Sequence, residues 1–335
     1  MTSAPTLRTP PRATNYAGGP RRVGVEIEFA AVSAGRAATR VCELYGGTVE
    51  REDAHKYHIN GTRFGDFIVE LDTQYAHRGP GERNTTERNT TTGLQGMMDT
   101  FTDSMREIYG DLGSLVIPYE IVCPPLDLED LPELEHMIRA LRDEGAKGTS
   151  DNLFHAFGFQ LNTDIATRDP EWLMAVLKAE VLLSEWLRSI ISIDMARRLL
   201  AFADPFPSAY VHQILKEDYW PGIDQLIDDY LIHNPTRNRE LDMLPLFMWL
   251  DEARVRAKVP DKLVKPRPTF HYRLPNANIS ETRWSLTLEW NRWCVIERLA
   301  EDRAKLAGMG AAYIANDQSI LSEDWALRCT EWLIV

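Results

Sequence analysis

Two glutamates whose side chains could take part in chemistry are Glu26 and Glu28. They lie in an alternating run that predicts a β-strand over residues 21–29. The alternation puts both carboxylates on one face of the strand and apolar side chains on the other. Carboxylates held side by side repel unless a cation lies between them, and hard oxygen ligands suit Mg²⁺ or Mn²⁺ better than Zn²⁺. The pattern therefore indicates a divalent cation site, although a strand with a solvated acidic face would alternate in the same way.

Four later segments repeat this division into an apolar and a polar face, over residues 67–72, 118–123, 157–164 and 283–290. Segments of this kind predict an α+β fold with one curved antiparallel sheet, helices on its back face and a polar cleft at its front. Such a cleft suits a charged ligand. Its predicted polar residues are Glu70, Asp72, Glu120, Gln160, Asn162, Arg283 and Glu289.

The order of these motifs resembles the amidoligase family of carboxylate-amine ligases, which are related to glutamine synthetase. The resemblance rests on Gly-Val-Glu-Ile-Glu-Phe at residues 24–29, an acidic strand after it, Tyr-Glu-Ile-Val-Cys-Pro-Pro-Leu at residues 119–126, and Gly-Phe-Gln-Leu-Asn at residues 158–162. It covers residues 21–165 with motifs and extends more loosely to about residue 300.

The resemblance implies a sheet of the glutamine synthetase catalytic type that holds ATP and Mg²⁺. A substrate carboxylate would be phosphorylated and an amine would then displace the phosphate, which depends mainly on positioning and charge neutralisation. The resemblance assigns metal ligation to Glu26, Glu28 and Glu120. Glu70 or Asp72 would complete the Mg²⁺ shell or orient the amine.

The late part of the chain would supply the positive charge. Arg273 and Arg283, both expected on strands, would offset charge on the transferring phosphoryl group, a task that suits a planar guanidinium. Glu289 would be a further metal ligand or an ion-pair partner of Arg283.

One motif departs from the family pattern. Where the family has a His-x-His pair, this chain has Gln160-Leu161-Asn162, and the nearby His155 is expected to pack rather than to react. The amides of Gln160 and Asn162 can hydrogen-bond a nucleotide and ligate Mg²⁺ weakly, but they cannot accept a proton as imidazole does. Two interpretations follow: a working ligase, or a catalytically degenerate relative that binds a nucleotide or peptide. A metal-dependent hydrolase that uses the same carboxylates is a third, which is disfavoured because the motifs contain no obvious general base.

The domain organisation follows from composition and turn signals. Residues 1–20 are predicted to be a disordered tail and residues 21–335 one catalytic domain, with a helical insert at about 170–262. Within the insert, residues 237–239 either bind an acidic substrate or cap the preceding helix. Residues 74–95 are predicted to be an exposed loop, whose arginines could close over nucleotide phosphates.

Composition limits the partners. The chain has 335 residues and a formal net charge of −13, which disfavours nucleic acid as a general partner. It has no apolar run near the ~18 residues of a membrane span. Four scattered cysteines fit free thiols in the cytoplasm. We expect small-molecule or peptide carboxylate and amine substrates, and a homo-oligomer is compatible with the relationship to glutamine synthetase.

Overall fold

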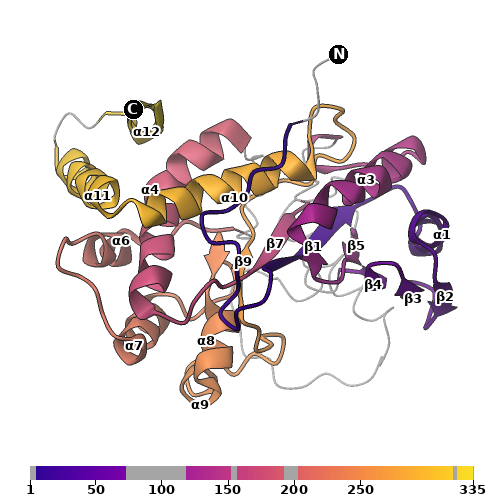
Figure 1. The fold of residues 1–335 in the computed structure, drawn as a ribbon, viewed down its shortest axis with the longest axis horizontal. Coiled ribbons are helices and arrows are strands. Elements are labelled where there is room, and N and C mark those ends of the chain that lie inside the picture. The colour runs from indigo at the N-terminus through magenta and orange to yellow at the C-terminus, as the bar shows by residue number, and fades with distance from the viewer. Residues whose placement is uncertain (1–4, 73–117, 152–156, 192–202, 320–322, 335) are drawn as a thin grey trace, which may run out of the picture.

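The computed structural model describes residues 5–72, 118–151, 157–191, 203–319 and 323–334, which form a mixed α+β fold built on one antiparallel sheet (Figure 1). The sheet has nine strands in the order β2-β3-β4-β5-β1-β7-β9-β8, and β6 also pairs with β1. Its strands are β1 (Arg22–Phe29), β2 (Thr48–Arg51), β3 (Tyr57–Thr62), β4 (Gly65–Leu71), β5 (Tyr119–Val122), β6 (Leu126–Asp127), β7 (Phe159–Asp164), β8 (Leu241–Asp242) and β9 (Thr269–Tyr272).

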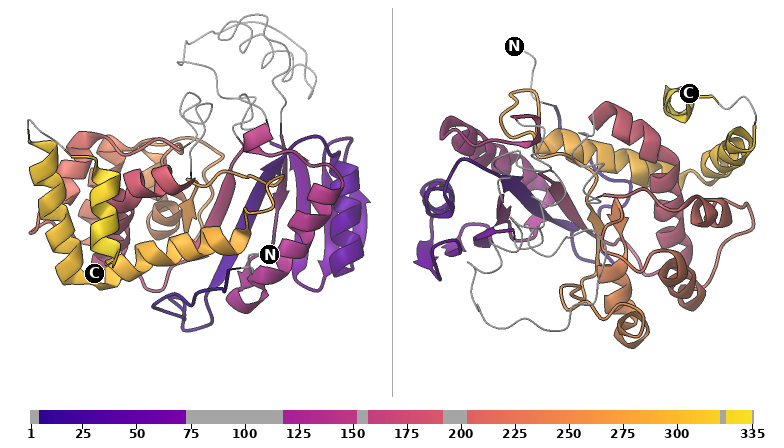
Figure 2. Two further views of the ribbon diagram at one scale, coloured as in Figure 1. Left: turned by 90° about the horizontal axis from the view of Figure 1, so that it is seen from above. Right: turned by 180° about the vertical axis from the view of Figure 1, so that it is seen from behind.

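Helices cover one face of this sheet, which we call the back, and continue into a helical layer beside it (Figures 1 and 2). The helices α1, α3 and α10 lie on the back, while α4 packs against α10, α11 and α12. The helices are α1 (Ala34–Tyr45), α3 (Leu134–Asp143), α4 (Pro170–Ile191), α6 (Ser208–Ile214), α7 (Ile223–His233), α8 (Leu244–Leu250), α9 (Glu252–Arg256), α10 (Leu286–Glu301), α11 (Arg303–Asp317) and α12 (Trp325–Ile334).

The alternation in β1 sets the two faces of the sheet. Val23, Val25, Ile27 and Phe29 are fully buried in the core on the back face. The two glutamates of β1 therefore point to the opposite face, the front, as the sequence predicts. The predicted strands over residues 67–72, 118–123 and 157–164 are confirmed as β4, β5 and β7.

The predicted strand over residues 283–290 is wrong. Leu286 begins α10, and the Ser285 side chain caps that helix by accepting a hydrogen bond from the backbone N–H of Leu288 at 3.1 Å. The alternation covers only a short window, whereas the apolar residues recur at helical spacing through Trp290 and Trp293. The longer helical pattern, together with the Ser285 cap, determines the structure. The strands that complete this side of the sheet are β9 and the two-residue β8.

The predicted helical insert at about 170–262 holds α4 and α6 to α9, but it also contributes β8 to the sheet. The predicted loop at residues 74–95 and His155 lie outside the described residues. Among the described residues, no helix is long and apolar enough to cross a membrane.

The segment before β1 is predicted from the sequence to be a disordered tail; in the structure, residues 5–12 of this segment run along α10. The Arg8 backbone N–H donates to Asn291 Oδ1 at 2.8 Å, and Trp290 Nε1 donates to the Arg8 carbonyl at 2.8 Å. These polar anchors on α10 give the segment a fixed course that its Pro-, Thr- and Gly-rich composition does not indicate.

A buried ion pair joins the start of β1 to α10. Arg21 and Glu297 form two hydrogen bonds, of 2.5 and 2.6 Å, and their side chains are 0% and 2% exposed. Arg21 Nε also donates to the Asp164 carbonyl at the end of β7, and Trp293 Nε1 donates to Glu297. The pair thus holds the helical layer against the centre of the sheet.

We expect Arg21→Ala to lower the free energy of unfolding by about 3–5 kcal/mol, because Glu297 then remains as an uncompensated buried charge. The control is Arg22→Ala, which removes the exposed neighbouring side chain and should change that free energy by less than about 0.5 kcal/mol. Urea unfolding followed by circular dichroism measures both. Equal losses in the two variants would contradict the role of the pair.

Candidate functional site

Three carboxylates form a row across the front of the sheet. Glu70 of β4 lies opposite Glu120 of β5, which in turn lies opposite Glu28 of β1. Like charges in directly opposed positions destabilise a sheet unless a positive group offsets them. Glu26 lies two residues from Glu28 along β1, so four predicted site residues share one small area of the front face.

A cavity of about 310 Å³, which we call the acid-lined cavity, opens beside this row. One part of its lining is acidic and another part, contributed by later segments of the chain, is basic. The acidic lining residues are Glu26, Glu70, Asp72, Glu120 and Asp242; the basic ones are Arg237, Lys265, Arg267 and His271. The cavity therefore presents both carboxylate oxygens and cationic groups to whatever it binds.

Glu26 sits where the two parts meet. Its Oε1 accepts a hydrogen bond from Asn162 Nδ2 at 2.8 Å and lies 3.5 Å from Arg267 Nη1, while its Oε2 lies 3.8 Å from His271 Nε2. Burial alone would raise the pKa of Glu26, but His271, Arg267 and Arg273 hold it well below its ordinary range. Glu26 is thus an anion that is only 7% exposed.

Glu120 has the opposite electrostatic environment. Burial raises the pKa of its carboxyl well above the usual range, and the neighbouring Glu26, Asp72, Glu28 and Glu70 raise it further. Its Oε1 is buried and accepts no hydrogen bond from any described residue. A buried acceptor without a donor costs free energy, so this oxygen is suited to a cation or a donor that a ligand brings.

The donor set fits Mg²⁺ in type. Among the described residues, however, no three His, Cys, Asp or Glu side chains converge as a complete metal cage. Mg²⁺ does not require one, because it is usually held by one or two carboxylates together with waters and substrate phosphates. Glu120 and Glu26 are the side chains that would hold it here, with Glu28 and Glu70 beside them; Lys56 Nζ already neutralises Glu70 at 3.1 Å.

The structure also brings an imidazole to this site, which the sequence analysis missed. His271 of β9 lies directly opposite Asn162 of β7, and its Nδ1 is 3.7 Å from Asp242 Oδ2. The sequence pattern that could have revealed it is the alternation in residues 269–273, where the buried Phe270 and Tyr272 alternate with polar residues. One imidazole from the neighbouring strand thus lies beside Asn162 and Glu26 on the front face.

The amides at the altered motif also face this region. Asn162 donates to Glu26, while its own Oδ1 and Gln160 Oε1 are buried and have no hydrogen-bond partner among the described residues. Arg273 follows β9 directly and its side chain is 3% exposed. Gln160, Asn162 and Arg273 therefore belong to the same region of the front face, although they do not line the acid-lined cavity itself.

Arg283 and Glu289 are not part of this cluster. They line a separate cavity of about 320 Å³ near the start of α10, and Glu289 Oε1 accepts hydrogen bonds from Trp284 Nε1 and Arg292 Nη1 at 3.1 and 2.6 Å. The strand that would have carried both residues onto the sheet is a helix, which removes the geometric basis for grouping them with Glu26. Their assigned roles in phosphate and metal binding stay predictions.

The two interpretations of residues 237–239 apply to different residues. Arg237 lines the acid-lined cavity and lies 3.5 Å from Asp261. Arg239 instead donates to the carbonyl of His233, the last residue of α7, and so caps that helix. Arg237 thus lines the acid-lined cavity while it is paired with Asp261.

Comparison with known proteins identifies the family. A family model described as "Putative amidoligase enzyme" matches residues 19–295, which include all nine strands and the start of α10. The chain belongs to this amidoligase family. Searches of curated proteins and of solved structures each found no match. The amidoligase match extends well beyond residue 165, through the helical insert and β9, and so includes His271.

We expect Glu120→Gln to stabilise the metal-free amidoligase domain at neutral pH. Because folding raises the Glu120 pKa, the wild-type carboxyl loses stabilising free energy as the pH rises from its ordinary value of 4.5 through the folded value. Above about pH 6 the variant should therefore be more stable by at least about 1 kcal/mol, and the difference should shrink towards pH 4.5.

Urea unfolding with EDTA between pH 4.5 and pH 8 measures this difference. The control is Glu331→Gln on α12, which replaces an exposed glutamate and should change the free energy of unfolding by less than about 0.5 kcal/mol. A Glu120→Gln protein that is less stable than the wild type at pH 7 would show that Glu120 makes a favourable contact in the metal-free state.

Proposed function

We propose that this amidoligase is an ATP- and Mg²⁺-dependent carboxylate-amine ligase that forms an amide or peptide bond through an acyl phosphate. The observation that carries the proposal is the acid-lined cavity, where Glu26 and Glu120 face Arg267 and His271. Nucleotide phosphates with a divalent cation need carboxylates for the cation and cationic groups for the phosphates, and one cavity offers both.

The reaction balances without a redox partner. An oxygen of the substrate carboxylate attacks the γ-phosphorus of ATP and ADP leaves; the amine nitrogen then attacks the acyl carbon, phosphate leaves, and the nitrogen loses a proton. When bound, Mg²⁺ supplies charge neutralisation for phosphoryl transfer. Arg267 and Arg273 would bind phosphate oxygens, and Glu26 and Glu120 would orient the cation.

The sheet is antiparallel, with helices on one face and charged groups on the other. This arrangement supports the proposal that the fold is of the glutamine synthetase type. The presence of His271 beside Glu26 favours a working ligase over a degenerate binder, because it restores an imidazole to a site whose motif carries Gln160 and Asn162. The four cysteines are free thiols, which supports a cytoplasmic location. The substrates would be small or peptidic carboxylates and amines.

We expect ATP together with Mg²⁺ to raise the melting temperature of the protein, and Mg²⁺ alone to raise it far less, since the cation would be held partly by substrate phosphates. Differential scanning fluorimetry measures both shifts. An equal shift with Mg²⁺ alone would favour a metal-dependent hydrolase that uses the same carboxylates.

Turnover is tested by phosphate release with ATP, Mg²⁺ and pools of carboxylates and amines. A ligase releases phosphate only when both partners are present, and we expect Glu26→Gln to reduce that rate by about 10–100-fold or more. The Glu331→Gln protein serves as the control with unchanged activity. Full activity in Glu26→Gln would refute the metal assignment, and ATP binding without release in any pool would identify a degenerate binder.

A further inference from the structure

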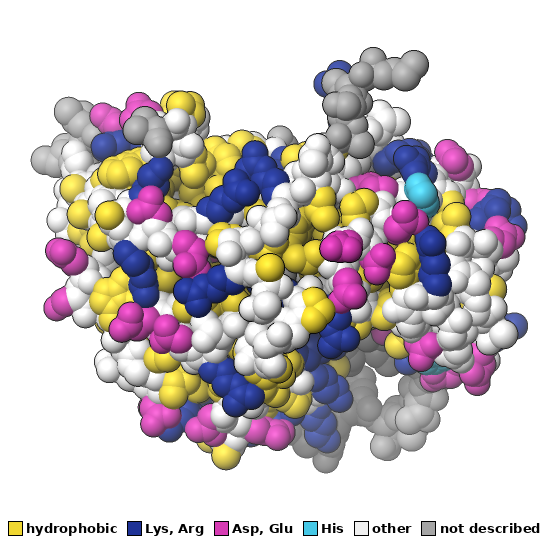
Figure 3. All heavy atoms as spheres, viewed as in Figure 1, with side chains coloured by type: hydrophobic (Ala, Val, Ile, Leu, Met, Phe, Trp, Pro, Cys, Tyr) yellow, Lys and Arg dark blue, Asp and Glu magenta, His cyan; other side chains and the backbone are white. Residues whose placement is uncertain are grey.

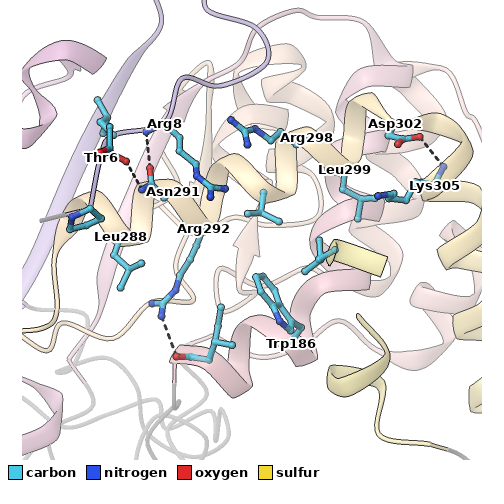
Figure 4. A pocket seen from close by; sticks show the side chains of 15 residues that line it. Thr6, Arg8, Trp186, Leu288, Asn291, Arg292, Arg298, Leu299, Asp302 and Lys305 are labelled. Carbon is cyan, nitrogen blue, oxygen red and sulfur yellow. Dashed lines mark hydrogen bonds between the residues drawn. The ribbon is translucent and has the colours of Figure 1, made fainter. Parts of the chain in front are cut away.

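A larger cavity, of about 940 Å³, lies on the helical side of the molecule and shares no lining residue with the acid-lined cavity. We call it the helical groove. The helix α10 runs along it, and α4, α11, α12 and residues 5–8 contribute to its sides (Figure 4). The groove is therefore a candidate site independent of the proposed ligase chemistry.

The groove follows a second apolar stripe on α10. The first apolar face of this helix packs on the sheet, where Trp293 lies 5.3 Å from the ring of Tyr272. Leu288, Val295 and Leu299 line the groove at spacings of one helix face, so α10 is apolar on two sides. Ile190 of α4, which is 39% exposed, extends the stripe, as does the half-buried Trp186.

Cationic side chains accompany the stripe along its length (Figure 4): Arg8, Arg292, Arg298 and Lys305. Among the described residues that line the groove, Asp302 is the only acid, and its Oδ1 already caps α11 by accepting from the Lys305 backbone N–H. Lysine and arginine side chains lie beside hydrophobic ones over this side of the molecule (Figure 3). In a chain of net charge −13, this is a local reversal of sign.

Two of these cations are free to meet a ligand. Arg292 pairs with Glu289 at 2.6 Å, and Lys305 Nζ donates to the Trp332 carbonyl at 3.1 Å. The exposed guanidinium groups of Arg8 and Arg298, by contrast, have no ion pair or hydrogen bond with any described residue. They are charges that nothing in the described part of the chain neutralises.

We propose that the helical groove docks an acidic amphipathic helix of a partner protein. The stripe from Leu288 to Asp302 is about 21 Å long, which matches a helix of about 14 residues. The apolar face of such a helix would cover Leu288 and Val295, and its carboxylates would meet Arg8 and Arg298. Nucleic acid is a poorer fit, because single strands need several stacking aromatic rings and this floor is mostly aliphatic.

The test uses a fluorescein-labelled 14-residue peptide with leucine at helical spacing and glutamate between, measured by fluorescence anisotropy at low salt. We expect saturable binding to the full chain and at least tenfold weaker binding to the double variant Arg8→Glu/Arg298→Glu. The control Arg139→Glu, which changes an exposed arginine on α3, should bind within twofold of the wild type. Added salt should weaken wild-type binding.

Two further measurements distinguish loss of the docking site from a folding defect and from nonspecific charge attraction. Arg8 contributes its backbone groups to the tether with α10, so its side chain can change without loss of those bonds, and melting temperatures check both variants. A second variant, Val295→Asn, should also weaken binding at least tenfold through the apolar stripe. Equal affinity of all variants, or equal binding of a peptide with serine in place of leucine, would overturn the proposal.

Competition identifies other occupants. If oleate or a single-stranded oligonucleotide displaced the labelled peptide at a lower concentration than the unlabelled peptide does, the groove would be a lipid or nucleic-acid site and the proposal would be wrong. Hydrogen exchange should show added protection in α10 when the peptide is bound. Protection elsewhere with none in α10 would equally overturn the assignment.

Discussion

The buried pair of Arg21 and Glu297 is the interaction on which the rest of the arrangement depends. It fixes the start of the central strand, the end of β7 and the helix α10 to one another through charge-assisted bonds in a dry environment. Pairs of this kind contribute little net stability, but removing one partner is costly, so they specify one way of packing. Here that packing presents the polar face of β1 to the front while α10 covers the back.

On the front face, charge is divided across the sheet. Most of the acids come from β4, β5 and β1, with Asp242 on β8, and the cationic groups come from β9, the segment before it and Arg237. The pKa values of neighbouring carboxyl groups consequently differ: cations lower the pKa of Glu26, whereas burial and other acids raise that of Glu120. Carboxyl groups with different pKa values in one cavity are common in sites that act on charged groups.

The sequence allowed prediction of the strands whose alternation is strict, because burial of one face leaves no other arrangement for residues such as Val25 and Ile27. It also predicted a strand near Arg273, where β9 ends one residue earlier, but a strand of four residues carries too little alternation to show that His271 faces the same side as Glu26. Residues 283–290 were mistaken for a strand because a helix apolar on two sides can alternate over a short window. The course of residues 5–20 depends on distant partners such as Asn291, which local composition cannot indicate.

The contact between Arg21 and Glu297 spans 276 positions of the chain. During synthesis the N-terminal part emerges first, at roughly 5–20 residues per second, so the central strand exists for many seconds without the helix that neutralises its buried arginine. The acidic strands likewise precede the cations of β9. Native packing of the helical layer on the sheet therefore waits until α10 has left the ribosome, and a nascent chain truncated before α10 would expose the apolar back of the sheet to chaperones.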